Sequence, residues 1–186
     1  AASFVVQTRS AARAAREFAV ACSRVQRPSG ALVFTSGALA EDGATLAREF
    51  AAAVPSLPLV IASGAGVATE RGEVENEAAA AGIVWTGGRC EVLSVSAGGA
   101  EEAIEGLARA LSDRSASSAP TALVFVRPEG VSPSSFEPLW NVRVTPNLLG
   151  AGTLSFDPVC VDAEGRISEG RAAALLLRGL SAPVIR

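Results

Sequence analysis

The sequence has no histidine, lysine, tyrosine or methionine among its 186 residues, and all 16 of its basic residues are arginine. Without histidine there is no imidazole for a Ser-His-Asp or Cys-His relay, and none to bind a metal ion. Without lysine there is no Schiff base and no phosphate-loop lysine. The remaining candidates for chemistry are carboxylates, hydroxyl groups, arginine and the three cysteines. We expect no catalytic residues, no metal site and no cofactor, the alternative being an enzyme that uses a carboxylate pair such as Glu73 and Glu75.

Long apolar runs are also missing, although 49% of the residues are hydrophobic. No uninterrupted apolar run approaches the ~18–20 residues that span a bilayer, so we expect no membrane span. The net charge is -3 and the arginines are scattered. Because no basic stripe is present to capture a phosphate backbone, we expect no nucleic acid partner.

Cysteine is scarce, and its three copies are far apart. Cys22, Cys90 and Cys160 lie in apolar contexts without a CxxC pair, so we expect buried, unpaired thiols, the alternative being a reactive or bridging cysteine. This usage favours a reducing, cytoplasmic location. The start AASFVV shows no signal peptide. The alternative is an organelle, with the chain excised or processed so that a targeting segment has been removed.

A buried strand ending in a glycine turn is predicted at Pro58–Val67 (PLVIASGAGV), and Pro146–Thr153 (PNLLGAGT) repeats the pattern. Glycine permits positive φ and close backbone approach, so the N–H groups of such turns can approach a carboxylate or phosphate. The alternative is that the glycines only turn the chain. Gly-Ala-Gly is not the GxGxxG fingerprint, so a dinucleotide site is not predicted.

Further repeats indicate an internal duplication. Ala31–Phe34 (ALVF) recurs as Ala122–Phe125, 91 positions later, and the stretch 77–87 is echoed by 169–179, 92 positions later. A solenoid repeat is only ~20–50 residues long, so this period indicates a duplicated half-domain. We expect residues 1–186 to form one domain of two pseudo-repeats, about 1–89 and 90–186.

Each pseudo-repeat is predicted to have the order β-α-β-α-β-β. Right-handed crossovers make the β-α-β steps parallel, whereas Gly87-Gly88 predicts an antiparallel hairpin, so the fold class is α/β with mixed sheets and helices on the sheet faces. A pseudo-twofold would bring the two glycine turns together around one cleft. The expected strands are 3–8, 31–35, 59–62, 77–86, 90–95 and 122–126, and the expected helices are 11–24 (capped by Ser10), 43–54, 100–113 and a short 133–140.

Acidic side chains follow the first glycine turn. Glu73, Glu75 and Glu77 alternate along the chain, so on an extended segment their carboxylates share a face that can receive an ammonium group or a hard cation. The alternative is a solvated, charged sheet edge. Arg71 and Arg89 flank this region and would either clamp a carboxylate or pair with the same glutamates.

The two tryptophans, Trp85 and Trp140, lie at similar apolar positions of the two pseudo-repeats. We expect both in the core, the alternative being the aromatic wall of a pocket.

With ALVFTSG, LAREFAAAVP, PLVIASGAGVATERGEVE and GIVW, continued by LLGAGT and AAALLLRGL, nearly the whole chain resembles the N-terminal FIST domain (F-box and intracellular signal transduction). The resemblance implies a non-enzymatic intracellular sensory module that binds small ligands such as amino acids and is followed by a C-terminal FIST partner domain. The alternative is a structural or assembly subunit that has lost ligand binding. The expected ligand-binding residues are Ser63, Gly64, Ala65, Gly66, Glu73, Glu75, Gly150 and Gly152.

The end of the chain predicts a protein contact. Ala182–Arg186 repeats the position of Cys90–Ser94, so a third unit would begin there. A strand left at a sheet edge offers unpaired N–H and C=O groups. We expect Pro183–Ile185 at an interface with a C-terminal FIST-like domain, a second copy of this chain or a larger assembly.

Overall fold

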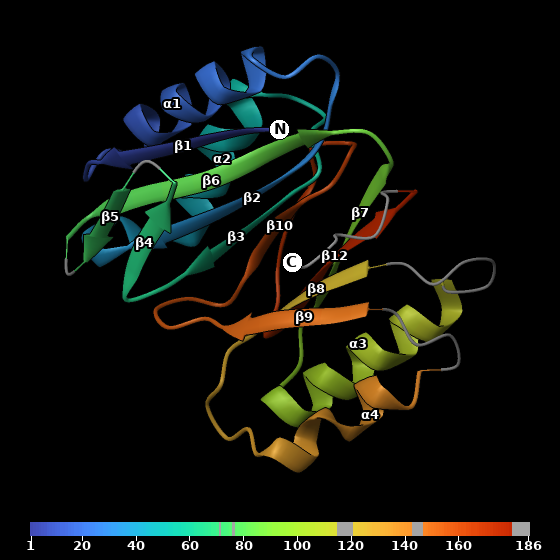
Figure 1. Ribbon diagram of the computed structural model, residues 1–186. Helices are drawn as coiled ribbons and strands as arrows, with labels where there is room; N and C mark the ends of the chain where they lie inside the picture. The colour runs from blue at the N-terminus through green and yellow to red at the C-terminus, as the bar shows by residue number, and fades with distance from the viewer. Residues whose placement is uncertain (71, 76, 115–120, 143–146, 180–186) are drawn as a thin grey trace.

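The computed structural model of the chain describes residues 1–70, 72–75, 77–114, 121–142 and 147–179, and shows a helix–sheet–sheet–helix sandwich (Figure 1). This confirms the predicted mixed α/β fold with helices on the sheet faces. The strands are β1 (Ala2–Gln7), β2 (Pro28–Ser36), β3 (Leu59–Ser63), β4 (Gly66–Thr69), β5 (Gly72–Glu75), β6 (Ala79–Thr86), β7 (Arg89–Val95), β8 (Thr121–Val126), β9 (Asn147–Gly152), β10 (Val159–Val161), β11 (Ile167–Glu169) and β12 (Ala172–Arg178). The helices are α1 (Ala11–Ser23), α2 (Gly43–Ala53), α3 (Ala100–Arg114) and α4 (Glu137–Trp140), with 3-10 turns η1 (Gly37–Ala40) and η2 (Pro133–Phe136).

Two large sheets form the middle of the sandwich. The first has the order β1-β6-β2-β3-β10-β11 and the second the order β7-β12-β8-β9, while β4 and β5 pair as a separate hairpin. Both sheets are mixed, because β2–β3 and β8–β9 are parallel whereas β6 and β12 are antiparallel to both of their neighbours. The mixed pairing that we predicted is therefore present in two sheets.

The second sheet repeats the order of the first four strands of the first sheet, β1-β6-β2-β3. Equivalent residues also meet at the interface between the two sheets. Phe34 lies opposite Ala81 in the first sheet, and Phe125 lies opposite Ala173 in the second. The rings of Phe34 and Phe125 pack edge-on, with their centroids 5.9 Å apart. On these two observations we propose that the two halves arose by duplication and are related by a pseudo-twofold.

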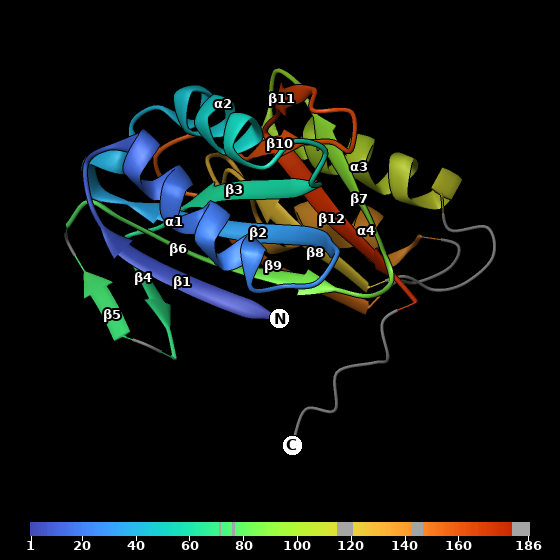
Figure 2. The ribbon, with the colours of Figure 1, turned by 90° about the horizontal axis from the view of Figure 1, so that it is seen from above.

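The helices cover the two outer faces, as Figure 2 shows from above. Helix α1 is capped by Ser10, as predicted, and the hydroxyl of Ser10 accepts a hydrogen bond from the N–H of Arg13. Phe18 of α1 and Phe50 of α2 are fully buried with their ring centroids 4.9 Å apart, over the outer face of the first sheet. Helix α3 packs in the same way on the second sheet. No helix within the described ranges is both long and apolar enough to cross a membrane.

The hairpin predicted at Gly87-Gly88 is wrong. Strand β6 already has β1 on one edge and β2 on the other, so no edge remains for β7, which pairs with β12 in the second sheet. Gly87 and Gly88, with φ of 91° and 65°, instead turn the chain from one sheet into the other.

The second Gly-Ala-Gly is a strand and not a turn. Ala31 pairs with Leu59 in the first sheet and the equivalent Ala122 pairs with Leu148 in the second, so Gly150 corresponds to Ile61 and Gly152 to Ser63. The letters that appear repeated in the sequence are therefore three positions out of structural register.

The two corresponding strands differ in their surroundings. Strand β3 is buried at all five positions, with β2 on one side and β10 antiparallel on the other. Strand β9 has β8 as its one neighbour among the described residues, and it is exposed at every position except Leu148. The predicted interface at Pro183–Ile185 lies outside the described residues.

Candidate functional site

An apolar groove of about 550 Å³ runs between strand β9 and the short helix α4. Strands β8 and β9 form one side, and the segment from Pro128 through η2 and α4 forms the other. The lining residues are Val124, Val126, Pro128, Val131, Ser132, Pro133, Phe136, Leu139, Trp140, Leu148, Leu149, Gly150, Ala151 and Gly152.

The groove exists because the helical layer is incomplete on this half of the molecule. In the first half, α2 has 11 residues and covers the sheet, whereas its counterpart is the turn η2 followed by the four residues of α4. Pro133 and Pro138 fit only the first turn of a helix, because proline lacks the N–H that a later helical position needs. The shortened segment leaves open the space that a longer helix would fill.

The wall formed by η2 is fixed to the rest of the fold. Ser132 and Ser135 form a reciprocal capping box at the start of the turn. The hydroxyl of Ser135, which is buried, donates a hydrogen bond of 2.6 Å to Oε1 of Glu101 on α3. The groove is therefore a preformed feature that does not need a ligand to order its wall.

Backbone atoms form the floor of the groove. A Cβ atom at Gly150 would lie 2.4 Å from the carbonyl oxygen of Val124, so only glycine fits at that position. A Cβ atom at Gly152 would make ordinary contacts of 3.5 Å or more with Pro128. A bound molecule would therefore touch the peptide groups of β9 closely.

Trp140 lies beside the groove with 61% of its surface exposed, so the prediction that it belongs to the core is wrong. It is the last residue of a helix too short to bring it over the sheet. Its alternative, an aromatic wall of a pocket, fits this position. Trp85 is half-buried and packs against the apolar layer between the sheets.

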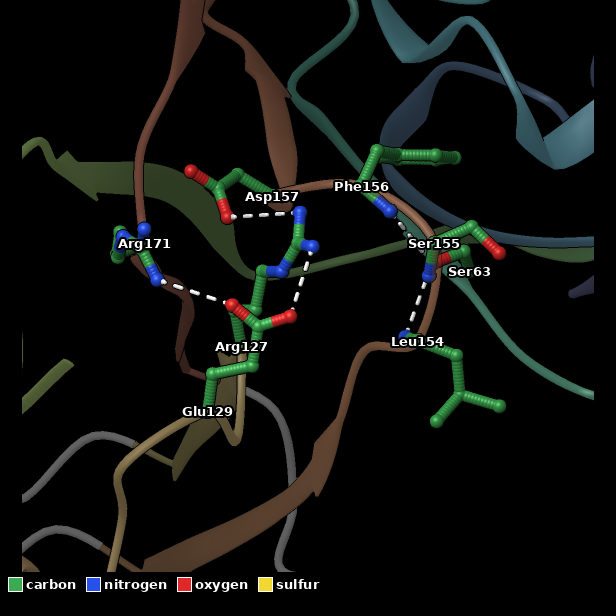
Figure 3. A network of polar contacts seen from close by, with 8 residues as sticks. All are labelled: Ser63, Arg127, Glu129, Leu154, Ser155, Phe156, Asp157 and Arg171. Atoms are coloured by element: carbon green, nitrogen blue, oxygen red, sulfur yellow. Dashed lines mark hydrogen bonds and ion pairs between the residues drawn. The ribbon is translucent and has the colours of Figure 1, made fainter.

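The first glycine turn is used within the fold. The buried hydroxyl of Ser63 accepts hydrogen bonds from the N–H groups of Leu154 (3.1 Å), Ser155 (2.9 Å) and, at 3.4 Å, Phe156 (Figure 3). Gly64 donates to the carbonyl of Thr35 at 2.8 Å. The ends of β3 and β9 are thus close together, but Ser63 binds the chain that follows β9 and does not face the groove, so the two Gly-Ala-Gly motifs do not line one cleft.

Charged groups surround this junction without entering the groove. Arg127 contacts Glu129 at 3.0 Å and Asp157 at 3.7 Å, and Arg171 contacts Glu129 at 3.7 Å (Figure 3). The hydrogen bond from Arg127 lowers the pKa of the Glu129 carboxyl below its usual value. The sequence analysis did not single out this network, because its members are spread over 45 positions and follow no motif.

The remaining predicted residues do not line the groove. Gly66 opens β4, where a Cβ atom would lie 2.9 Å from the carbonyl of Val74 on β5, and Ala65 is exposed before it. Glu73 and Glu75 are exposed on β5.

Glu77 accepts a hydrogen bond from Gln7 and borders a polar hollow of about 330 Å³ with Arg9. Arg71 is outside the described residues, and Arg89 begins β7. Within the described part of the chain, no three Asp, Glu or Cys side chains are grouped so that they could hold a metal ion.

All three cysteines are free, as predicted. Cys22 and Cys160 are buried and Cys90 is half-buried. Burial raises the pKa of the thiol to about 11 for Cys22 and to about 12 for Cys90 and Cys160. Thiols with such pKa values are protonated at neutral pH and are poor nucleophiles.

Comparison with known proteins supplies one match. The family model described as the FIST N domain matches residues 30–185. No curated protein and no solved structure matches the chain. The matched range contains both β9 and the whole lining of the groove. The chain therefore belongs to the FIST N domain family, a family of sensory domains of signal transduction.

Proposed function

We propose that this chain is a non-enzymatic sensory module that binds a small, largely apolar molecule in the groove between β9 and α4. The observation that carries the proposal is the groove itself: a preformed hollow of about 550 Å³ with a backbone floor and an exposed tryptophan at its side. Hollows of roughly 300–1,000 Å³ with mostly apolar linings are typical of small-molecule sites.

The lining determines which part of a ligand can be buried. None of the lining residues is charged, and Ser132 is the one that carries a side-chain hydroxyl. Burying an ionised group without a partner is strongly unfavourable. The ligand would therefore place an aliphatic or aromatic part against Leu148 and Val126, and its polar groups toward solvent or the peptide groups of β9.

Amino acids, the ligand class that the resemblance suggests, fit this lining only in part. Their ammonium and carboxylate groups would have no charged partner in the groove, whereas a large apolar side chain would fill it. Among amino acids we therefore propose those with aromatic or long aliphatic side chains. The predicted ligand residues Gly150 and Gly152 belong to this proposal, and Ser63, Gly64, Ala65, Gly66, Glu73 and Glu75 do not.

The test uses the position of Trp140. In a Trp85→Phe variant, Trp140 is the one remaining indole, so its fluorescence reports on the groove. A panel of aromatic and aliphatic amino acids and their uncharged amides is titrated, with thermal unfolding measured in parallel. A ligand at a hundredfold its dissociation constant adds about 2.7 kcal/mol of stability. We expect fluorescence and thermal responses to the apolar members of the panel.

Two leucine substitutions separate the groove from the other glycine motif. Gly152→Leu would fill the groove and abolish the response, whereas Ala65→Leu, at an exposed position outside the groove, would retain it. A response that Ala65→Leu abolishes and Gly152→Leu does not would contradict the site. Absence of a response to every member of the panel would contradict the ligand class.

The second candidate function is an assembly subunit without a ligand. The specific observation that favours it is the edge of β9 with which no described strand pairs, because an unpaired strand edge can be extended by another chain. In that case Gly152→Leu would change the association of the chain and no ligand response would exist. The predicted partner contact through residues 183–185 remains a separate proposal.

A further inference from the structure

Strand β9 lacks the neighbour that its counterpart possesses. In the first sheet, β10 pairs antiparallel with β3, placing Val159 opposite Ile61 and Val161 opposite Leu59. Nothing in the described part of the chain occupies the corresponding edge of β9. Val60 is fully buried, whereas Leu149, at the equivalent position, is 51% exposed.

One residue explains why the chain covers one edge and not the other. The hydroxyl of Ser63 holds the N–H groups of the segment that leads into β10, and so directs that strand onto β3. The equivalent residue of β9 is Gly152, which has no side chain with which to hold the corresponding segment. After β3 the chain instead enters β4, and Val67 packs on Ala79 and Ala81 of β6.

Within its described residues, strand β9 has none of the usual protection of an edge strand against pairing. Natural edge strands are blunted by charged residues, proline or bulges. Strand β9 has the sequence NLLGAG, without charge or proline. Two more exposed apolar side chains, Trp140 (61%) and Leu154 (55%), lie on either side of it in sequence.

We propose that a second copy of this chain pairs with β9, so that two β9 strands lie antiparallel about a twofold axis that passes midway between the two Gly150 residues. In an antiparallel pair, two opposite residues either both point their N–H and C=O groups toward the partner strand or both point them away from it. When the strands are identical, the twofold axis therefore passes midway between two copies of the same residue. With the axis at Gly150, Leu149 lies opposite Ala151 and Leu148 lies opposite Gly152. Each large side chain then meets a small one.

The paired strands would join two four-stranded sheets into one of eight strands. One strand pair with its flanking side chains is a small contact, and interfaces below about 1,200 Å² are usually weak and transient. We therefore expect a reversible dimer that forms as the protein concentration rises. The proposal does not depend on a ligand, so it can fail or succeed independently of the proposed function.

The first experiment measures association of the whole chain without ligand, by sedimentation velocity over a concentration series. We expect the wild type to shift from monomer to dimer, and Leu149→Lys to remain monomeric at every concentration because it places two like charges beside the axis. Ile83→Lys, a matched change at a strand position that is 44% exposed in the first sheet, should dimerise as the wild type does. Circular dichroism checks that both variants fold.

The second experiment fixes the register by disulfide formation. Opposite residues of antiparallel strands have Cα atoms about 4.5–5.5 Å apart, which a disulfide can bridge. Leu149→Cys mixed with Ala151→Cys should give a covalent dimer under mild oxidation, whereas each variant alone and the wild type should not. Cross-linking of Leu149→Cys alone would place the axis at Leu149 and contradict the register.

Two results would overturn the pairing. A wild type that stays monomeric throughout the series would exclude the second copy and leave the edge to a strand of a different partner. A dimer that Leu149→Lys does not weaken, and that the cysteine mixture does not trap, would place the contact on another surface.

Discussion

The hydroxyl of Ser63 joins the two halves of the molecule, and its removal should destabilise the whole fold. It accepts hydrogen bonds of 2.9 Å from Ser155 and 3.1 Å from Leu154, with a longer one from Phe156. A hydrogen bond contributes about 1 kcal/mol net, and a donor left without a partner costs about 1–3 kcal/mol. Leu154 keeps a second acceptor, the carbonyl of Ser63 at 3.3 Å. We therefore expect Ser63→Ala to lower the free energy of unfolding by about 2 kcal/mol.

The chain offers a matched control for this change. The hydroxyl of Ser94, also on a strand, is buried and has no hydrogen-bond partner among the described residues, so Ser94→Ala removes a buried polar group without breaking a hydrogen bond that they make. We expect that variant to be neutral or slightly stabilising.

Denaturant unfolding measures both variants against the wild type. The midpoint should fall for Ser63→Ala with the slope unchanged, and the melting temperature should fall by roughly 4–8 °C, given 2–4 °C per kcal/mol for chains of this size. If the two alanine variants prove equally stable, the hydroxyl of Ser63 does not hold the segment after β9, and the account of why β10 covers β3 is wrong.

Three further predictions concern other parts of the chain. Hydrogen bonds from the side chain and the N–H of Thr45 lower the pKa of the Asp42 carboxyl from 3.8. The wild type should therefore have a higher free energy of unfolding than Asp42→Asn at neutral pH, and this difference should disappear as the pH falls through the lowered pKa. A difference that does not change with pH would contradict this. Thiol titration at neutral pH should be slow in the native state, and all three cysteines should react only in denaturant. Cys90 should react before the other two because it is half-buried. Rapid labelling of the native protein would contradict the burial of the thiols. Gly150→Ala should cost about 1–3 kcal/mol by overpacking against the carbonyl of Val124, whereas Gly152→Ala should be nearly neutral, and equal stabilities by thermal unfolding would contradict the close approach.

Local patterns in the sequence predicted the helices and six of the strands, namely β1, β2, β3, β6, β7 and β8. Leu46 and Phe50 recur at helical spacing and are buried in α2, and Ser10 caps α1 as its side chain allows. The offset of 92 between Ala81 and Ala173 also agrees with the register, since both lie opposite the equivalent phenylalanines.

Pairing between distant strands was less predictable. Gly87-Gly88 marks a turn, but which strand lies next to β6 depends on whether its edges are already taken, and that is not a local property. The sequence repeat aligns Gly64 with Gly150, because both begin a Gly-Ala-Gly motif. The strand registers of the two sheets instead align Ser63 with Gly152. Cross-strand packing sets register, and the glycines contribute no side chain to it.

The groove could not be predicted from any motif, because it results from what is missing around β9. Its lining contains no charged or catalytic side chain from which a sequence analysis could predict a site. Two signals were nonetheless present: the prolines at 133 and 138, which limit the length of the fourth helix, and glycine where the other half has Ser63. Each gains its meaning only when the two halves are aligned by structure.

The groove and the open edge share Leu149, Gly150, Ala151 and Gly152. If the groove binds a ligand and the edge binds a second copy, ligand binding and dimerisation are thermodynamically linked. A ligand that changes the dimerisation constant must bind the dimer and the monomer with different affinities, and the overall factor is the same for both equilibria. Such a linkage would let a small molecule control the oligomeric state directly, without a hinge motion or a domain rotation to couple the two sites. The sign of the linkage would depend on whether the ligand fills space that the second β9 strand needs or orders the side chains that this strand contacts.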